Sequence, residues 1–375
     1  MGCVSLKGLI ILNISSGYLA YEIMHMEKLV ATVSTLGKAK IYNAQFMPYD
    51  MYLEESSDVD SLENNLENFY YWCTSRMFPL NRTYADEIMQ GLGITVSLTN
   101  KERAQLAISY NCVSLNDVYW VRVVGENKTF SELNLYDREL NDTIIALPLR
   151  GKLLPVSSRD LAQDLSTRGR FPKAWIRSGA KLSLLKADGA AVQRELLASK
   201  ICQCFDIPQV TYEEYFYDGE VVSRSTIVTS KELSMVSKMA YDIYAVNNDL
   251  DTVEECIRLD PIVYYGMNIL DYLVGNTDRH QENWGFLIDN TTNQPISLYP
   301  LMDFNMSFQT YDKLDGANCL TAGSRNLSQR EAAIEAVKAI GLRQICDVDM
   351  NIFEGMDQER EMFKLRLAEL KKYAK

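Results

Sequence analysis

The segment 275–303 constrains this chain more than any other part of its sequence. It reads GNTDRHQENWGFLIDNTTNQPISLYPLMD, in which Asp278 and Asn283 form the pattern D-x-H-x-x-N and Asp303 follows at the end. Two short apolar runs flank a polar turn between Asn283 and Asp303, which indicates a β-hairpin. A hairpin returns the chain to its starting point, so we expect Asp278, Asn283 and Asp303 to lie close together.

This spacing is typical of a phosphoryl-transfer site. In kinase-type enzymes one Asp orients the attacking hydroxyl, while an Asn and a later Asp hold the Mg²⁺ ions that bridge the ATP phosphates. Asp278 and Asn283 are separated by the same step as the Asp and Asn of the protein-kinase loop H-R-D-x-x-x-x-N. Mg²⁺ prefers hard oxygen ligands. We therefore expect Asp278 to be catalytic and Asn283 and Asp303 to bind the metal.

His280 completes the pattern, and it is one of two histidines in the chain, the other being His25. With so few histidines and no clustered cysteines, a tetrahedral zinc site has no ligand set. We assign His280 to the catalytic loop, which we expect it to brace by a hydrogen bond. No G-x-S-x-G elbow occurs, which disfavours a Ser-His-Asp hydrolase.

A second group of expected elements lies upstream, in the order strand, helix, strand, strand. The first strand is apolar and ends in a lysine, and the helix that follows has no internal Gly or Pro. The last two strands flank Asp218-Gly219, a pair that favours a tight hairpin turn. This order is typical of a nucleotide-binding lobe, and the four segments are 182–186, 191–205, 210–217 and 221–228.

Lys186 and Glu195 match the strand Lys and helix Glu of kinases. There the Lys contacts the α and β phosphates and the Glu holds it in place. We expect both residues to serve ATP binding, with Lys181 as a competing lysine in a poorer position.

The run Ser166-Thr167-Arg168-Gly169 is the candidate loop over the phosphates. A glycine permits close backbone approach, and backbone N–H groups can point at the anion. We expect Thr167 and Gly169 to contact ATP. The chain has no Walker A sequence, and a simple linker turn is the alternative interpretation of this run.

Composition excludes several other classes of protein. The 375 residues carry a formal net charge of −12, so direct binding to nucleic acid, itself a polyanion, is disfavoured. The eight cysteines are scattered without a CxxC pair, which favours free thiols in a reducing compartment.

The apolar run 9–12 is too short to span a membrane. The start Met-Gly-Cys-Val-Ser-Leu lacks the Ser or Thr that myristoylation requires at its sixth position. We expect a cytoplasmic protein without membrane contact.

Three regions follow from these patterns. Residues 1–150 form an N-terminal α+β region of unknown role, 151–240 hold the ATP-binding strands and helix, and 241–375 hold the catalytic loop and metal-binding Asp. The boundary falls in 150–173, which contains several Pro, Gly and Ser residues.

Helix ends are marked by local signals. Thr99-x-x-Glu102 and Ser328-x-x-Glu331 are capping boxes, which predict helix starts. Asp260-Pro261 predicts the start of a helix that stops at Gly275, so the catalytic loop should leave a helix end.

The run 275–283, the segment Leu301-Met-Asp-Phe-Asn305, and the strand 184–186 with 195–200 together resemble the HipA-like serine/threonine kinases. The likeness covers 165–375. In weaker form, Ser114-Leu-Asn-Asp-Val-Tyr-Trp120 is similar to an element that precedes the kinase region in some bacterial members.

The resemblance implies an α+β, two-lobed protein-kinase-like fold, with a small β-rich lobe and a larger helical lobe behind the extra N-terminal region. It implies ATP and Mg²⁺ as cofactors, a serine on a protein substrate as acceptor, and a bacterial toxin with an antitoxin partner. By position it implies a catalytic Asp278, metal ligands Asn283 and Asp303, and an ATP-binding Lys186. It also implies self-phosphorylation of the phosphate loop, with Ser166 and Thr167 as the candidates.

Two departures limit what the resemblance transfers. Residues 1–150 do not resemble the shorter N-terminal region of the founding toxin, so that toxin's antitoxin contacts and target are not carried over. Asp303-Phe-Asn replaces the Asp-Phe-Gly of ordinary protein kinases, which keeps the metal ligand but removes the glycine. Two alternatives stay open: a lipid or small-molecule kinase, because D-R-H-x-x-N also occurs in phosphoinositide kinases, and a nucleotide-binding pseudokinase scaffold.

Overall fold

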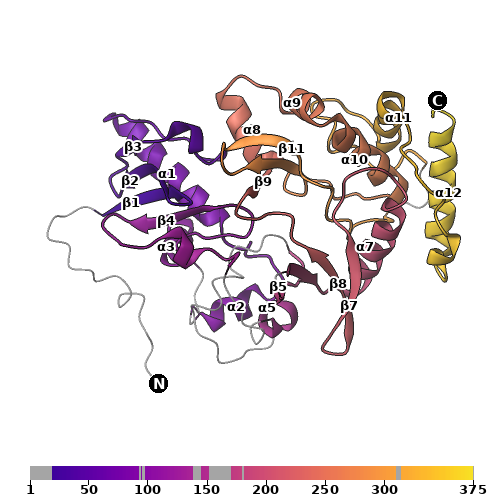
Figure 1. The fold of residues 1–375 in the computed structure, drawn as a ribbon, viewed down its shortest axis with the longest axis horizontal. Helices are drawn as coiled ribbons and strands as arrows, with labels where there is room; N and C mark the ends of the chain where they lie inside the picture. Colours follow the sequence, from indigo (N-terminus) through magenta and orange to yellow (C-terminus); the bar gives the residue numbers. More distant parts are fainter. Residues whose placement is uncertain are drawn as a thin grey trace. The chain divides into compact units, whose positions relative to one another are not determined.

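The computed structural model describes residues 19–92, 94, 98–137, 145–151, 170–179, 181–309 and 314–374. The chain forms two compact units, Met1–Leu182 and Ser183–Lys375 (Figure 1). Both contain antiparallel sheets and helices, so the expected α+β class is confirmed. The candidate phosphate loop with Ser166, Thr167 and Gly169 lies outside the described residues. The three-region division stays a prediction.

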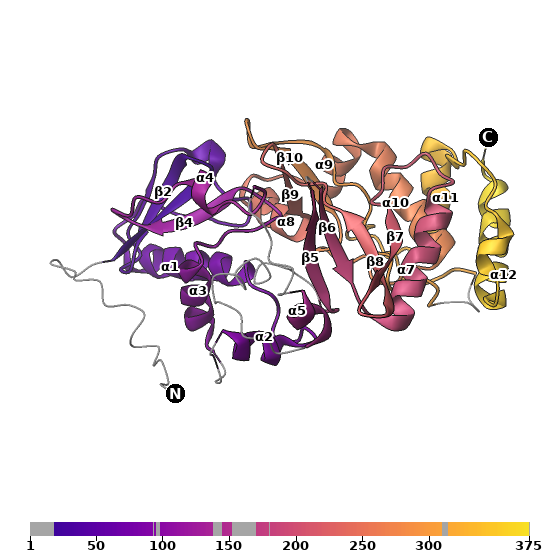
Figure 2. The same ribbon diagram turned by 60° about the horizontal axis from the view of Figure 1, so that its bottom comes forward.

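The first unit is built on an antiparallel sheet in the order β3-β2-β1-β4. Helix α1 (Val59–Ser75) packs against this sheet and against α3 (Asn100–Ser109), as Figure 2 shows. The capping box expected at Thr99 is present at the start of α3. The elements of this unit also include β1 (Ala20–His25), β2 (Lys28–Ser34), β3 (Ala39–Ile41), a 3₁₀ turn (Ala44–Phe46), α2 (Ala85–Gly91), β4 (Tyr119–Val123), α4 (Phe130–Leu133), α5 (Ala146–Arg150) and β5 (Lys173–Ser178).

His25 at the end of β1 is buried in the core of this unit. It is 2% exposed, and its ring lies 5.0 Å from that of Phe46 and 4.9 Å from that of Tyr119. Its Nε2 is buried without a hydrogen-bond partner among the described residues. Burial lowers the pKa of His25 from 6.5 to about 4, because the apolar surroundings disfavour the charged form.

We expect the protein to lose stability as the pH falls from 6.5 toward 4. In that range the unfolded chain binds a proton at position 25 that the folded chain excludes, so the free energy of unfolding rises with pH. The full effect is about 3 kcal/mol, from about 1.4 kcal/mol per pKa unit. Urea unfolding followed between pH 4 and 7 measures it. The His25→Phe variant should lose this component, and an unchanged slope in that variant would contradict the assignment.

The second unit begins with three neighbouring strands in the order β6-β8-β7. The three strands are β6 (Lys181–Lys186), β7 (Tyr212–Tyr217) and β8 (Glu220–Thr226). Strands β7 and β8 lie against helix α7 (Gly189–Cys202) (Figure 1). The turn between β7 and β8 has positive φ at Asp218 (52°) and at Gly219 (82°). These are the left-handed angles that a two-residue hairpin turn needs, so the hairpin expected at Asp218-Gly219 is confirmed.

A second sheet in this unit carries the hairpin expected after Asn283. Strands β10 (Gly285–Asp289) and β11 (Gln294–Leu298) pair antiparallel, which confirms the hairpin. Strand β9 (Leu233–Ser237) pairs with the other side of β10 and was not foreseen from the sequence. The hairpin brings the chain back toward the loop that precedes β10.

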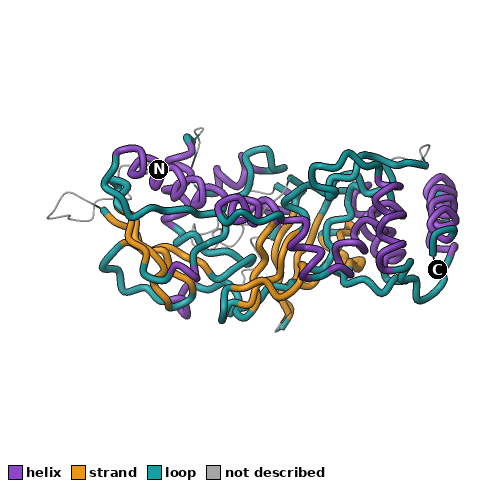
Figure 3. The backbone as a smooth tube through the Cα atoms, turned by 90° about the horizontal axis from the view of Figure 1, so that it is seen from above, coloured by secondary structure: helices purple, strands orange, loops and turns teal. Residues whose placement is uncertain are grey.

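Helix α10 (Pro261–Val274) is the buried central helix of the second unit. The carboxylate of Asp260 accepts a hydrogen bond from the N–H of Val263 at its start, and Gly275 ends it with φ 63°. Both ends are therefore where the sequence predicts them. Helices α10, α11 and α12 contact one another (Figure 1). Figure 3 shows that the chain near the C-terminus is mainly helical. The remaining elements are α8 (Lys238–Asn247), α9 (Thr252–Leu259), α11 (Gln329–Ile340), a 3₁₀ turn (Met350–Phe353) and α12 (Asp357–Lys371).

The seven cysteines among the described residues are all free thiols, in agreement with the expectation from the sequence. Among these residues, no helix combines the length and the apolar character needed to cross a membrane.

Candidate active site

Lys186 forms ion pairs with two carboxylates that come from different parts of the second unit. This lysine ends β6, and its Nζ lies 2.6 Å from Oε1 of Glu195 on α7 and 3.0 Å from Oδ1 of Asp303, which follows β11. Lys186 and Glu195 are both buried. The structure therefore brings together three of the residues that the sequence predicts, two of them separated by 117 positions.

Glu195 has a second anchor besides Lys186. Its Oε2 accepts a hydrogen bond of 2.6 Å from the hydroxyl of Ser223 on β8. The carboxylate is 0% exposed. Burial raises the pKa of Glu195, while the neighbouring ammonium of Lys186 opposes this shift. With one oxygen on Lys186 and the other on Ser223, the orientation of Glu195 is fixed.

Charge in this cluster is unbalanced. Burial alone would lower the pKa of Lys186, but the carboxylates of Asp303 and Glu195 hold it well above its ordinary value, so the lysine stays protonated. Two carboxylates thus share one ammonium group.

Asp303 is held in an unusual backbone conformation. Its φ is 61°, in the left-handed region that residues other than glycine rarely adopt and that is often found at functional sites. Its N–H donates to the hydroxyl of Tyr212 at 2.9 Å, and its C=O accepts from Nδ2 of Asn276 at 3.5 Å. The surrounding hydrogen bonds hold this conformation in place.

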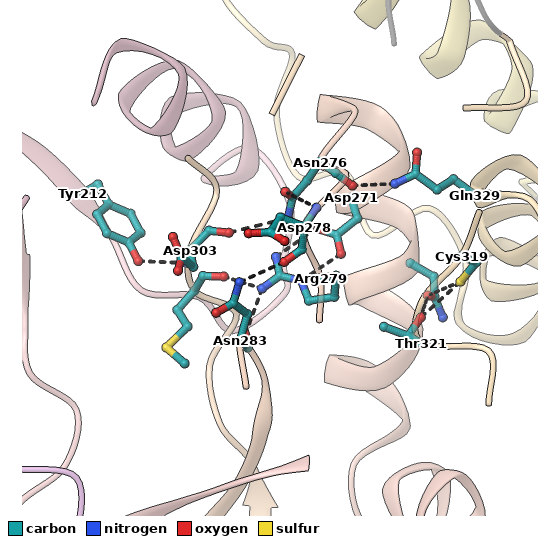
Figure 4. A network of polar contacts seen from close by, with 12 residues as sticks. Tyr212, Asp271, Asn276, Asp278, Arg279, Asn283, Asp303, Cys319, Thr321 and Gln329 are labelled. Carbon is teal, nitrogen blue, oxygen red and sulfur yellow. Dashed lines mark hydrogen bonds and ion pairs between the residues drawn. The ribbon is translucent and has the colours of Figure 1, made fainter. Parts of the chain in front are cut away.

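The candidate catalytic loop is closed by hydrogen bonds around Asp278. The N–H of Asp278 donates to Oδ1 of Asn276 at 3.3 Å, and its C=O accepts from Nδ2 of Asn283 at 2.8 Å. The carboxylate of Asp278 is 44% exposed. Figure 4 shows Asp278, Asn283 and Asp303 close together, around Arg279. The backbone is fixed while the carboxylate remains accessible.

His280 lies in the same loop. Its Nδ1 accepts a hydrogen bond of 3.2 Å from the N–H of Glu282, and its Nε2 lies 3.9 Å from Oδ2 of Asp278. The first contact is of the bracing kind expected from the sequence. Its part in catalysis stays a prediction.

Arg279 connects the two loops of the site, a role that the sequence does not predict. Its Nε and Nη2 donate to the two carboxylate oxygens of Asp271 on α10, each at 2.8 Å. Its Nη1 donates to the C=O of Asn283 at 3.0 Å and to the C=O of Met302. Burial would lower the pKa of Arg279, but the Asp271 carboxylate raises it, so the guanidinium stays charged. One buried side chain thus links α10, the catalytic loop and the residue before Asp303.

The donor set fits a magnesium ion bound together with phosphates. The amide nitrogen of Asn283 is engaged with Asp278, which leaves Oδ1 as the acceptor atom of that side chain. Asp303 supplies a carboxylate. Within the described ranges, no group of three or more His, Cys, Asp or Glu side chains is placed to hold a metal by itself. Mg²⁺ is commonly held by one or two protein ligands plus substrate phosphates. Asn283 and Asp303 would supply these two protein ligands.

Two residues of the site that were not predicted carry a signal in the sequence. Arg279 lies inside the D-R-H run, and Asp271 is the only charged residue in helix α10. Tyr212 and Ser223 carry no such signal, because ordinary strand positions hold both. Thr167, Gly169 and Ser166 fall outside the described residues, so their roles stay predictions.

No protein-family model and no curated protein matches the chain. Similar solved structures include the Helicobacter pylori proinflammatory kinase CtkA, at 15% identity over 54% of this chain and 90% of that one, with a TM-score of 0.39. HipA of Shewanella oneidensis MR-1, from a toxin–antitoxin complex with HipB and operator DNA, matches at 11% identity over 94% of both chains, with a TM-score of 0.49.

A third solved structure, the complete CtTel1 dimer, matches at 10% identity with a TM-score of 0.28. The match covers 88% of this chain and 17% of that one. All three TM-scores lie below 0.5, so the function is inferred from the geometry of the site itself.

Proposed function

We propose that this protein is an ATP- and Mg²⁺-dependent kinase that transfers the γ-phosphate to a serine or threonine hydroxyl of a protein. The observation that carries the proposal is the contact of Lys186 with both Glu195 and Asp303, next to the loop of Asp278 and Asn283. Kinases bind the ATP phosphates with a lysine that is held by a glutamate and lies near an aspartate that binds Mg²⁺.

Each residue has a defined task in this proposal. Lys186, oriented by Glu195, contacts the phosphates of ATP. Asn283 and Asp303 hold Mg²⁺, which neutralises charge on the phosphates when it is bound. The exposed carboxylate of Asp278 accepts a hydrogen bond from the acceptor hydroxyl and orients its oxygen toward the γ-phosphate. Arg279 links the loop that contains Asn283 to the loop that contains Met302 and so fixes their separation.

The likeness of 275–283 to the HipA-like kinases supports a protein acceptor and a toxin role beside an antitoxin. In this proposal β6, β7, β8 and α7 belong to the small lobe, and α8 to α12 belong to the large lobe. Self-phosphorylation at Ser166 or Thr167 would regulate the enzyme. A cytoplasmic location agrees with the free cysteines.

A labelling experiment tests this function. The full chain is incubated with γ-labelled ATP and Mg²⁺, together with a general protein acceptor or phosphoinositide vesicles. Label on serine or threonine of the protein acceptor, or on a peptide containing Ser166 and Thr167, supports a protein kinase. Label on lipid favours the alternative that D-R-H-x-x-N also permits. Nucleotide binding without any transfer of label would identify a scaffold and contradict the proposal.

A further inference from the structure

Tyr212 contacts both ends of the candidate nucleotide site. It lies on β7 and is 5% exposed, and its hydroxyl accepts the 2.9 Å hydrogen bond from the N–H of Asp303. The face of its ring lies 5.0 Å from Nζ of Lys186, a distance at which an aromatic ring attracts a cation. In Figure 4 the Tyr212 hydroxyl points at Asp303. The side chain of Tyr212 therefore contacts both Lys186 and Asp303, the candidate metal ligand.

Tyr212 is itself held in place. Its N–H donates to Oγ of Ser199 on α7 at 3.0 Å, and Ser199 is 0% exposed. Helix α7 also carries Glu195, the partner of Lys186. The ring and the Lys186–Glu195 pair are thus fixed to the same helix, so the hydroxyl is presented to Asp303 from a rigid position.

The hydrogen bond from Asp303 is made in a conformation that needs support. At φ 61° the backbone of Asp303 is strained, and such strain persists only where neighbouring groups hold it. Without an acceptor, the N–H of Asp303 would lose its partner, and a residue relaxing to negative φ would turn its carboxylate away from Lys186. The hydroxyl of Tyr212 is the acceptor that this N–H uses.

We propose that Tyr212 is a positioning residue that holds the Asp303 carboxylate in its metal-binding orientation and thereby sets the Mg²⁺ affinity of the site. This inference rests on the proposed function, because it assumes that Asp303 binds Mg²⁺ together with a nucleotide. Tyr212 acts through Asp303 and touches neither the metal nor the acceptor.

The test uses Tyr212→Phe, which keeps the ring beside Lys186 and removes only the hydroxyl. Tyr264→Phe is the matched control, since Tyr264 is also fully buried in this unit and its hydroxyl donates to the C=O of Thr321 at 3.0 Å. Calorimetry measures the affinity of the full chain for a non-hydrolysable ATP analogue, with and without saturating Mg²⁺. The ratio of the two affinities reports how strongly the site couples metal to nucleotide.

We expect Tyr212→Phe to reduce this ratio about tenfold, equivalent to about 1.4 kcal/mol, and to leave the metal-free affinity within about twofold. Tyr264→Phe should leave the ratio unchanged even if its melting temperature falls. An unchanged ratio in Tyr212→Phe, or an equal loss in Tyr264→Phe, would overturn the role of Tyr212 while the proposed function stands. A wild-type chain whose affinity for the analogue does not depend on Mg²⁺ would overturn both.

Discussion

Replacement of Asp278 by Asn should lower the turnover number for phosphoryl transfer by about 10²- to 10⁴-fold, the range that a positioned acid–base group contributes. The substitution conserves shape and keeps the hydrogen bonds that the backbone N–H and C=O of this residue make with Asn276 and Asn283. The loop should therefore keep its conformation. What is lost is the carboxylate that orients the acceptor hydroxyl.

The measurement is single-turnover transfer from labelled ATP, with nucleotide affinity determined in parallel. Nucleotide affinity should change little, because Lys186, Asn283 and Asp303 are untouched. Glu282→Gln is the matched control, since it removes the same charge from an exposed side chain of the same loop. Turnover within about tenfold of wild type in Asp278→Asn would exclude this residue as the catalytic group.

Replacement of Arg279 by Met should destabilise the protein by about 3–5 kcal/mol, the cost of breaking a buried ion pair from one side. Asp271 would be left as a buried carboxylate with its charge uncompensated, and the C=O groups of Asn283 and Met302 would lose their donor. Transfer activity should fall together with stability, because the same side chain ties the catalytic loop to the residue before Asp303.

Urea unfolding of wild type and variant gives the free energy of unfolding. The double variant Asp271→Leu/Arg279→Met should recover part of the loss, since it removes both charges together. Arg258→Met is the control for an arginine ion pair at the surface, because the side chain of Arg258 contacts Glu255 and is 67% exposed. This control should lower the free energy of unfolding by no more than about 1 kcal/mol. A loss of the same small size in Arg279→Met would show that the buried pair does not hold the site together.

Several parts of the fold are predictable from the sequence because they depend on residues only a few positions apart. A capping box needs a hydroxyl and a carboxylate three residues apart, and those at Thr99 and Ser328 both form. The Asp218-Gly219 turn depends on two left-handed residues alone. The ends of α10 follow from Asp260 and Gly275 in the same way.

Other parts depend on packing and carry no local signal. Strand β9 is recognised only through its pairing with β10, which lies some fifty residues later in the chain. Tyr212 and Ser223 occupy ordinary strand positions, and their importance comes from the side chains that α7 and the loop after β11 place beside them.

For the candidate site, the sequence by itself determined which residue types are present and their spacing in one loop: Asp278, His280, Asn283 and, after a hairpin, Asp303. Only the tertiary structure decided that Lys186, paired with Glu195 as expected, also reaches Asp303, and that Arg279 joins α10 to both loops. The physical reason is one of range. Turns and caps depend on backbone angles and near neighbours, whereas contacts across more than a hundred residues depend on how the whole unit packs.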